Sequence, residues 1–440
     1  MRTAEFHDVM NRFVRGDGPG AAVAIRQGGE VVHSAGYGLA NVEWGVPVDT
    51  ETVFRIGSIT KQFTAAAILE LAADGKLAID DPLERHLPDY PLNGRRITIR
   101  HLLNHTSGIK SVTAMPVFAE VMRRDLSLAE NIALFRDAPP DFAPGERFLY
   151  NNSGYLLLGA IIEAASGMSY EAFLGETFFA PLGLTRTSYL HNDPIVTKRA
   201  SGYSLAPTLR NAAPLSMTLP HAAGSLGSTA EDLLAWELAL RSGRAVGAAN
   251  YEAMTTPGRL SDGAPIAYGF GLLNQSYRGH RLVGHGGGIN GFLSNLAHWP
   301  EHDLTIAILS NCDGFPVQQV AFALARRVLG EPDLAREAIP LDAAALERCA
   351  GRYVFDLGQN VALKVKDGAL TAHFPRFNSV FRPFGESAFF LDGDPEVTLT
   401  FDNLQDGVFH GMMVGGYGEP VRSTRAPAPV TDPATAPTTA

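Results

Sequence analysis

"RIGSITKQF", residues 55–63, opens a helix with a serine and places a lysine one turn into it. The apolar spacing that follows predicts a helix over 58–74, ending at Gly75. Serine is a favoured N-cap, but Lys61 stands where Glu or Gln would complete a capping box with Ser58. A cation there lies against the positive end of the helix dipole, which disfavours a charged surface side chain. Lys61 is therefore a candidate for a chemical role.

Ser58 and Lys61 are three residues apart, so their side chains share one face of the predicted helix, about 5–6 Å apart at Cβ. A serine hydroxyl is a poor nucleophile unless a neighbouring base takes its proton. Lysine, with an ordinary pKa of about 10.4, is such a base only where burial and positive surroundings keep it neutral. The helix N-terminus supplies this bias. An S-x-x-K pattern alone also occurs by chance as an N-cap followed by a solvated lysine.

Two further segments carry side chains suited to the same chemistry. In "FLYNNSGY" (148–155), Tyr150 and Asn152 precede a helix that ends at Gly167, and in an extended segment they face the same side. The alternative is that Asn152 or Ser153 caps this helix and Tyr150 packs. In "VGHGGGING" (283–291), a histidine leads three glycines at a strand edge. Glycines there let a substrate approach closely and leave peptide N–H groups free to bind an oxyanion.

The first 330 residues have strand-like segments at both ends and a helical, loop-rich middle. Residues 21–38 read as two strands joined at Gly28-Gly29, and segments from about 266 to 310 read as short strands followed by a helix at 316–329. A helix at "GSTAEDLLAWELALRSG" has Ser228 and Glu231 spaced as a capping box. This order predicts an α+β fold with one antiparallel sheet, flanking helices and a helical subdomain.

The C-terminal part has a different pattern. Residues 330–345 read as a linker, and 346–424 as short alternating strands with turns at Asp367-Gly368, Asp392-Gly393 and Asp406-Gly407. That spacing predicts a small up-and-down all-β barrel. We therefore divide the chain into a domain over 1–335, a barrel over 346–424 and a disordered tail over 425–440.

Composition excludes several function classes. The 440 residues are 45% hydrophobic and 19% charged, with net charge 36 − 46 = −10 and no block of like charge. This argues against binding to nucleic acid or an anionic membrane, because both require a basic face. No apolar run approaches the length of a membrane span. Cys312 and Cys349 are too few for a disulfide framework, and we expect both in the core. As the chain stands we expect a cytoplasmic protein, or a periplasmic or secreted one if a leader has been removed.

Three motifs in this order resemble the serine β-lactamase and penicillin-recognising hydrolase superfamily. S-x-x-K stands at 58–61, Y-x-N at 150–152 and H-x-G, in place of K-T-G, at 285–287; "LLNHTSGI" (102–109) adds to the resemblance, which covers about 5–330. With H-x-G in place of K-T-G, the sequence is similar to D-aminopeptidases, D-amino-acid amidases and esterase-like members of the superfamily. Several of these relatives carry a C-terminal lipocalin-like barrel. The resemblance thus implies a β-lactamase-like fold followed by a lipocalin-like barrel.

The resemblance also implies roles for individual residues. Ser58 is the nucleophile, activated by Lys61 together with the Tyr150 phenol, which also protonates the leaving group. Asn152 holds Lys61 and the substrate carbonyl, and His285 lies beside Tyr150. The oxyanion and substrate site consists of the Ser58 and Gly288 backbone N–H groups, with Gly286 and Gly287 beside them.

We therefore predict a cofactor-free and metal-free serine hydrolase that acts on a small-molecule or peptide substrate through an acyl-enzyme. The expected substrates are D-amino-acid peptides or amides, or small acyl esters. The alternatives are an acyltransferase or peptide-cyclising thioesterase of the same fold, and a penicillin-recognising binding or sensor protein. The sequence carries no signal for an oligomeric state.

Other patterns are rejected on their context. Gly286-x-Gly288-x-x-Gly291 fits a dinucleotide fingerprint, but a strand follows it where a helix is needed. His298-x-x-Glu301-His302 fits a zinc pattern, but it contains Pro300 and falls at a strand–strand turn. His105 reads as a hydrogen-bonded loop residue, since no G-x-S-x-G elbow supports a Ser–His–Asp triad.

Overall fold

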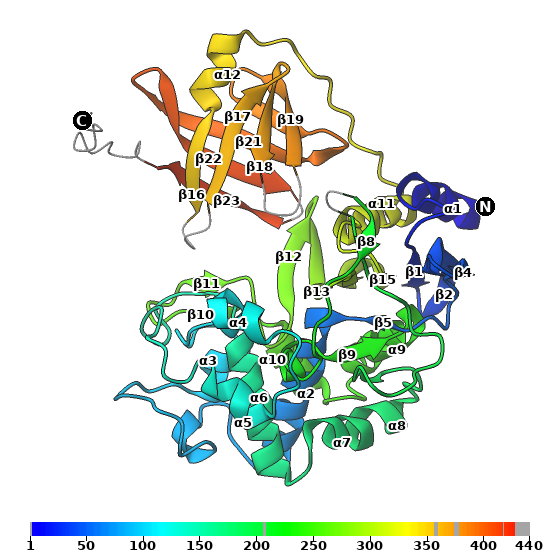
Figure 1. Cartoon of the computed structure of the whole chain (residues 1–440), viewed down its shortest axis with the longest axis vertical. Coiled ribbons are helices and arrows are strands. Elements are labelled where there is room, and N and C mark those ends of the chain that lie inside the picture. The colour runs from blue at the N-terminus through cyan, green and yellow to red at the C-terminus, as the bar shows by residue number, and fades with distance from the viewer. Residues whose placement is uncertain (1, 206–207, 356–359, 374–377, 417, 427–440) are drawn as a thin grey trace, which may run out of the picture. The chain divides into compact units, whose positions relative to one another are not determined.

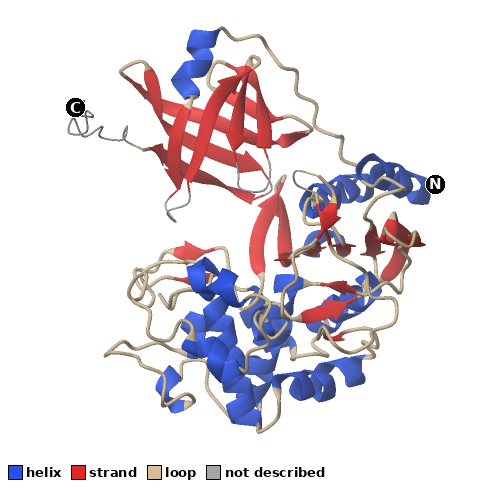
Figure 2. Ribbon diagram, in the orientation of Figure 1, coloured by secondary structure: helices blue, strands red, loops and turns tan. Residues whose placement is uncertain are grey.

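The computed structural model describes residues 2–205, 208–355, 360–373, 378–416 and 418–426. The chain divides into two compact units, Met1–Pro332 and Asp333–Ala440. Figure 1 follows both units along the chain, and Figure 2 shows helices and strands combined in the first unit and mainly strands in the second. Each unit has its own hydrophobic core, so each is described by itself.

The main sheet of the first unit joins strands from both of its ends, which confirms the predicted α+β arrangement. Neighbouring strands are antiparallel, and β1 and β2 form the predicted hairpin, turning at Gly28 and Gly29 with positive φ. The order within the described residues is β12 (Leu273–Tyr277), β13 (His280–Ile289), β14 (Phe292–Trp299), β15 (Leu304–Ser310), β1 (Ala21–Gln27) and β2 (Glu30–Tyr37).

Helices cover the sheet on both faces. Every residue of β15 is buried, as expected for a strand with no solvent-facing side. α1 (Arg2–Phe13) and α11 (Val317–Leu329) pack against each other and against the sheet. α9 (Ala230–Arg241) packs against β1 and β15.

The central helix of the unit is α2 (Thr60–Ala73), which has no polar stripe and is buried on nearly all sides. It packs against α6 (Asn152–Ser166), and Phe63 of α2 stacks on Trp236 of α9 with ring centroids 3.8 Å apart. This burial is what takes the side chain of Lys61 out of water. The turn before α2 contacts β13 and β14, which brings the start of the helix to these two strands.

The rest of the first unit consists of short elements in the helical middle region. The helices are α3 (Ile99–Leu103), α4 (Pro116–Val121), α5 (Leu128–Ala133), α7 (Tyr170–Leu174), α8 (Ala180–Leu182) and α10 (Ala248–Thr255). The short strands are β3 (Leu39–Asn41), β4 (Val46–Pro47), β5 (Phe54–Arg55), β6 (Ser188–Tyr189), β7 (Tyr203–Ser204), β8 (Arg210–Asn211), β9 (Leu226–Ser228), β10 (Gly258–Arg259) and β11 (Pro265–Ile266).

The second unit confirms the predicted barrel: its eight described strands are antiparallel and close through β16 and β23. Asp367-Gly368 and Asp406-Gly407 turn with positive φ at both residues, as two-residue hairpins of type I′ require. Buried side chains such as Tyr353, Leu370 and Phe389 fill the interior. The elements are α12 (Ala343–Cys349), β16 (Gly351–Phe355), β17 (Asn360–Lys366), β18 (Ala369–His373), β19 (Asn378–Gly385), β20 (Ala388–Leu391), β21 (Asp394–Gln405), β22 (Val408–Gly416) and β23 (Gly418–Arg425).

Some predicted boundaries are wrong by a few residues. α12 begins at Ala343, inside the segment read as a linker, because Asp342 caps it by accepting from the Ala345 N–H. α9 is capped by Thr229, which accepts from Asp232, and not by Ser228 with Glu231. β23 runs to Arg425, one residue past the predicted end of the barrel, and residues 427–440 of the tail predicted over 425–440 lie outside the described residues.

The described residues contain no single helix that is long and apolar enough to cross a membrane, although α6 together with Tyr170–Leu182, bent by 77°, passes that test by length and composition. Cys312 and Cys349 are both buried and free.

Candidate active site

Ser58 stands on a tight turn directly before α2. Gly57 has φ of +51° and opens a 3-10 turn, Gly57–Ile59, that leads into the helix. Ser58 is partly exposed and its side chain caps neither this turn nor α2, so the predicted N-cap role is wrong. The physical reason is that its Oγ lies 3.0 Å from Lys61 Nζ. The serine hydroxyl therefore forms a hydrogen bond with Lys61 and does not cap the helix N-terminus.

Lys61 is fully buried, and its side-chain nitrogen Nζ has three oxygen neighbours. Besides Ser58 Oγ, they are Asn152 Oδ1 and the Ala223 carbonyl oxygen, each 2.8 Å from Nζ. No carboxylate is among these neighbours, and burial holds the pKa of Lys61 well below its ordinary value. A neutral amine has two hydrogens and one lone pair. The amide and carbonyl oxygens can only accept, so the lone pair is left for the Ser58 hydroxyl hydrogen.

Asn152 reaches Lys61 because its neighbour caps the helix. Asn151 is the N-cap of α6 and accepts from the Gly154 N–H at 3.0 Å, so the expected alternative of capping by Asn152 or Ser153 is wrong. Asn152 Nδ2 donates to Thr113 Oγ1 at 3.1 Å. This second bond fixes the amide with its oxygen towards Lys61. Thr113 lies in a 3-10 turn, and no sequence pattern pointed to it.

Tyr150 lies on the other side of Lys61, whose Nζ is 4.8 Å from the centroid of the tyrosine ring. The Tyr150 hydroxyl oxygen is buried and has no hydrogen-bond partner among the described residues. Burial raises the pKa of Tyr150 above its ordinary value, and the nearby Ser58 hydroxyl offsets only part of this. The phenol is therefore protonated at neutral pH and is available as a proton donor.

His285 lies on β13 and is buried beside Tyr150, with ring centroids 6.0 Å apart. Its Nδ1 donates to the Gly286 carbonyl oxygen, so Nε2 is the acceptor from the Tyr268 hydroxyl at 2.9 Å. Burial, with Lys61 nearby, lowers the pKa of His285 to about 3. The ring is thus a neutral group whose two nitrogens are both occupied. Tyr268 is a loop tyrosine that sequence reasoning missed.

The glycines of β13 form an open strand edge next to Ser58. β12 pairs with β13 only as far as Gly284, so the residues beyond it have no strand on that side within the described structure. A Cβ on Gly287 would lie 2.0 Å from the Ile56 carbonyl oxygen, and one on Gly57 would lie 2.9 Å from Gly288 N. Only glycine allows this approach. It brings the Gly288 amide to the turn that carries Ser58.

The rejected patterns are explained by the structure. His298 lies on β14 and Glu301 and His302 in the following 3-10 turn, where His302 bonds to His280 at 2.9 Å. The described residues contain no group of three or more His, Cys, Asp or Glu that could hold a metal ion. Gly291 lies in a turn between two strands, so the glycine fingerprint opens no helix.

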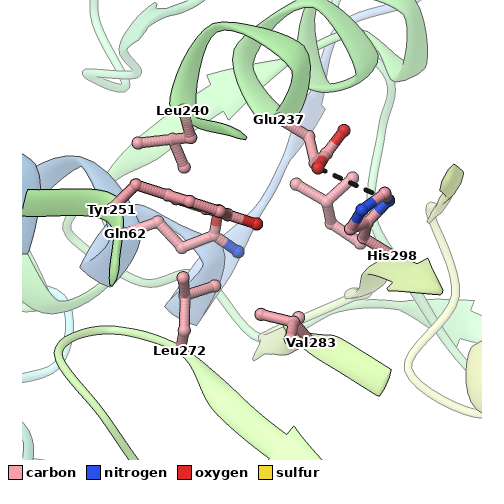
Figure 3. A pocket seen from close by; sticks show the side chains of 9 residues that line it. Gln62, Glu237, Leu240, Tyr251, Leu272, Val283 and His298 are labelled. Carbon is pink, nitrogen blue, oxygen red and sulfur yellow. Dashed lines mark ion pairs between the residues drawn. The ribbon is translucent and has the colours of Figure 1, made fainter. Parts of the chain in front are cut away.

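A second buried polar cluster lies on another side of α2, around a small cavity shown in Figure 3. Glu237 of α9 and His298 of β14 face each other there, with Oε1 and Nδ1 3.5 Å apart. Burial raises the pKa of Glu237 to about 7, although Thr305 and Arg241 oppose this shift. Gln62 of α2 lines the cavity and accepts from the Trp236 indole N–H. Of these residues the sequence analysis singled out only His298, as part of the rejected zinc pattern.

Two curated relatives resemble this chain over most of its length. Penicillin-binding protein 4* of Bacillus subtilis (strain 168) is 29% identical over 399 residues, which cover 84% of this chain and 87% of that protein. D-aminopeptidase of Brucella anthropi is 31% identical over 317 residues, which cover 71% of this chain and 60% of the relative. This chain therefore spans less than two thirds of the D-aminopeptidase.

Solved structures give the same result. The octameric penicillin-binding protein homologue from Pyrococcus abyssi superposes with a TM-score of 0.69 at 28% identity, covering 96% of this chain and 98% of that one. D-amino acid amidase from Ochrobactrum anthropi SV3, in complex with L-phenylalanine amide, gives 0.64 at 27% identity, covering 75% and 96%. The Beta-lactamase family matches residues 6–329. Because this match spans more than half of the sequence, the chain belongs to the Beta-lactamase family.

Proposed function

We propose that this protein is a serine hydrolase that cleaves amide or ester bonds through an acyl-enzyme on Ser58. The observation that carries the proposal is the environment of Lys61. Complete burial, two obligate acceptors and the absence of a neighbouring carboxylate lower the pKa of Lys61 and favour a neutral amine, whose lone pair would accept from the Ser58 hydroxyl 3.0 Å away. A protein that only binds ligand has no need of such a base, which disfavours the sensor alternative.

In acylation, Ser58 Oγ attacks the substrate carbonyl carbon while Lys61 Nζ takes the hydroxyl proton. The carbonyl oxygen becomes an oxyanion, for which the backbone N–H groups of Ser58 and Gly288 are the donors. The close approach of the 57–58 turn to Gly288 supports the assignment of these two N–H groups as oxyanion donors. The positive end of α2 adds to this stabilisation.

Collapse of the tetrahedral intermediate breaks the bond to the leaving group, whose nitrogen or oxygen takes the phenolic proton of Tyr150. The Lys61 ammonium then returns its proton to Tyr150, which restores the neutral pair. A water attacks the acyl carbon, Lys61 accepts its proton, and Ser58 Oγ regains that proton as the acid leaves. An acyltransferase or cyclising thioesterase would differ only in using an amine or another nucleophile in place of this water.

We infer that D-amino-acid amides, D-amino-acid peptides and small acyl esters are the substrate class. The similarity to D-aminopeptidase and D-amino acid amidase supports this assignment. So does His285, whose neutral ring offers no cation to a substrate carboxylate. Substrates without a carboxylate beside the scissile bond are therefore favoured over penicillins.

The test is covalent labelling followed by turnover. Intact-mass spectrometry after exposure to a fluorophosphonate should show one adduct, which peptide mapping places on Ser58. Ser58→Ala protein should remain unlabelled, and equal labelling of that variant would disprove the assignment. A panel of D- and L-aminoacyl anilides and p-nitrophenyl esters then identifies the acyl group, and added amines reveal any acyl transfer.

A further inference from the structure

His105 follows α3 and has an unusual backbone conformation. Its φ is +62°, in the left-handed region that residues other than glycine adopt uncommonly. The residue is buried, and the backbone after it is held by a hydrogen bond from the Thr106 N–H to the His101 carbonyl at 2.9 Å. A residue in this conformation persists where surrounding contacts require it, so the partners of His105 indicate its role.

Those partners are the two residues that flank Tyr150. The Leu149 N–H donates to the His105 carbonyl oxygen at 3.0 Å, and the Asn151 N–H donates to His105 Nδ1 at 3.1 Å. The imidazole also packs on the Tyr150 ring, with centroids 4.4 Å apart. His105 thus holds the residue before Tyr150, the residue after it and the tyrosine ring itself. The positive φ is what turns both the carbonyl and the ring of His105 towards the same strand-like segment.

The bond from Asn151 also determines the protonation state of the imidazole. Because Nδ1 accepts, the ring proton is on Nε2, and a doubly protonated ring could not make this bond. Burial, followed by the nearby Lys61 and His285, keeps the pKa of His105 well below its ordinary value. The other rings that face it are uncharged aromatics, Phe148, Tyr155 and Tyr268. The acceptor at Nδ1 is therefore present across the working pH range.

We propose that His105 is the positioning residue of the proton-transfer site: by holding Leu149 and Asn151 it sets the Tyr150 hydroxyl and the Asn152 amide against Lys61. The position of the Asn152 amide depends on His105 because Asn151 is the N-cap of α6 and Asn152 is the first residue of that helix. His105 acts through these residues, since its hydrogen bonds go to their backbone and not to Ser58 or Lys61. The inference rests on the proposed function, because it assigns His105 a part in the same proton transfers.

A leaving-group comparison separates positioning from a merely structural role. An amine leaving from an anilide needs the proton of Tyr150, whereas p-nitrophenolate leaves readily without one. Displacing Tyr150 should therefore slow the anilide more than the p-nitrophenyl ester of the same acyl group. Loss of folded protein alone would lower both rates equally, and fluorophosphonate titration of Ser58 corrects for it.

The matched variants are His105→Asn and His105→Gly, because both residues tolerate positive φ. Asparagine places an oxygen acceptor near the position of Nδ1, whereas glycine removes the acceptor. We expect His105→Gly to lower the anilide-to-ester ratio of kcat by roughly 10–100-fold, the effect of a misplacement of about 1 Å. His105→Asn should keep most of the wild-type ratio. His101→Asn is the control: the ring of His101 bonds to Thr98 in the cap of α3, and the ratio should stay unchanged.

An unchanged ratio in His105→Gly, or an equal loss in His105→Asn, would overturn the inference. If His105→Gly does not fold, His105→Gln takes its place. The longer glutamine side chain puts its amide near the position of Nε2, beyond that of Nδ1, so the Asn151 N–H is left without an acceptor. Failure of the proposed function is distinct from these outcomes. It would appear as wild-type protein that is neither labelled at Ser58 nor able to cleave either substrate.

Discussion

Lys61 and Gln62 are consecutive residues of α2, yet they belong to two different buried polar clusters. Lys61 faces Ser58 and Asn152, while Gln62 lines the cavity of Glu237 and His298. Each cluster holds a buried ionisable group whose pKa is shifted towards the neutral form, down for Lys61 and up for Glu237. In both cases burial is the main cause.

The clusters differ in their partners. Lys61 is bound by uncharged oxygens and lies 3.0 Å from the partly exposed Ser58 hydroxyl, so its lone pair has a proton to take at a position open to substrate. Glu237 lies beside Arg241 at 3.3 Å and His298 at 3.5 Å, and bonds to buried Thr305. A shifted pKa therefore marks a catalytic group only where a reactive partner open to substrate accompanies it.

The largest effect should come from breaking the Lys61 cluster. Lys61→Ala and Tyr150→Phe should each lower kcat by roughly 10²–10⁴-fold, the usual range for general acid–base groups. The double variant should be little worse than either single one, because residues that transfer one proton act as a unit. Lys61→Arg should not restore activity, since a guanidinium stays charged.

Steady-state kinetics of the four variants, corrected by active-site titration, checks this expectation. Independent losses that multiply in the double variant would contradict a shared proton-transfer role. Rescue by Lys61→Arg would contradict the neutral base.

A smaller effect is expected from adding charge to the uncharged partners of Lys61. Asn152→Asp puts a carboxylate 2.8 Å from Nζ, which stabilises the ammonium and raises the pKa of Lys61. Lys61 must be neutral to act, so the acid limb of the kcat/KM profile should move to higher pH, with activity lost at pH 7 and recovered above it. Asn152→Ala removes the acceptor without adding charge and should not move the limb upward. An identical pH profile in both variants would show that Lys61 is not the titrating base.

The sequence predicted the half of the site that is local. Ser58 and Lys61 meet because they are three residues apart at a helix start, a spacing that needs no knowledge of the fold. Tyr150, Asn152 and His285 could be joined to them only through the resemblance to a family. The capping roles of Ser58 and Asn152 were misjudged because side chains drawn to Lys61 leave those positions to other residues.

What the sequence could not show depends on contacts between distant segments. The Ala223 carbonyl that binds Lys61 has no side-chain signature, and Tyr268 is one of many tyrosines. His105 was read as a loop residue, which is correct for its location, but its bonds to both neighbours of Tyr150 appear only in three dimensions. Glu237 looks like an ordinary helix glutamate until β15 and β14 cover it.

The neutral His285 should also affect which substrates the site prefers. His285→Lys places a cation where the neutral imidazole now stands, which suits the carboxylate of a penicillin. We expect kcat/KM for benzylpenicillin relative to a D-aminoacyl anilide to rise about tenfold, the equivalent of about 1.4 kcal/mol. His285→Gln, which stays neutral, is the control. Wild-type protein that hydrolyses penicillin as well as its best anilide or ester would show that His285 does not discriminate.

The smallest effect on activity should come from the Glu237 cluster, where Glu237→Gln should leave kcat within about twofold because no reacting atom is touched.

The main effect of Glu237→Gln should instead be on the stability of the folded protein. The folded pKa of about 7 exceeds the ordinary value of 4.5, so the folded state binds this proton more tightly than the unfolded state. The free energy of unfolding should therefore fall as pH rises from about 4.5 to 7, by on the order of 1–3 kcal/mol. Glutamine mimics the protonated carboxyl, so Glu237→Gln should remove this slope and be more stable than wild type at pH 8. Urea unfolding at pH 5, 6, 7 and 8 measures it, with exposed Glu231→Gln on the same helix as the control. A loss of kcat in Glu237→Gln as large as that in Asn152→Ala would erase the distinction between the two clusters, because both would then serve the reaction.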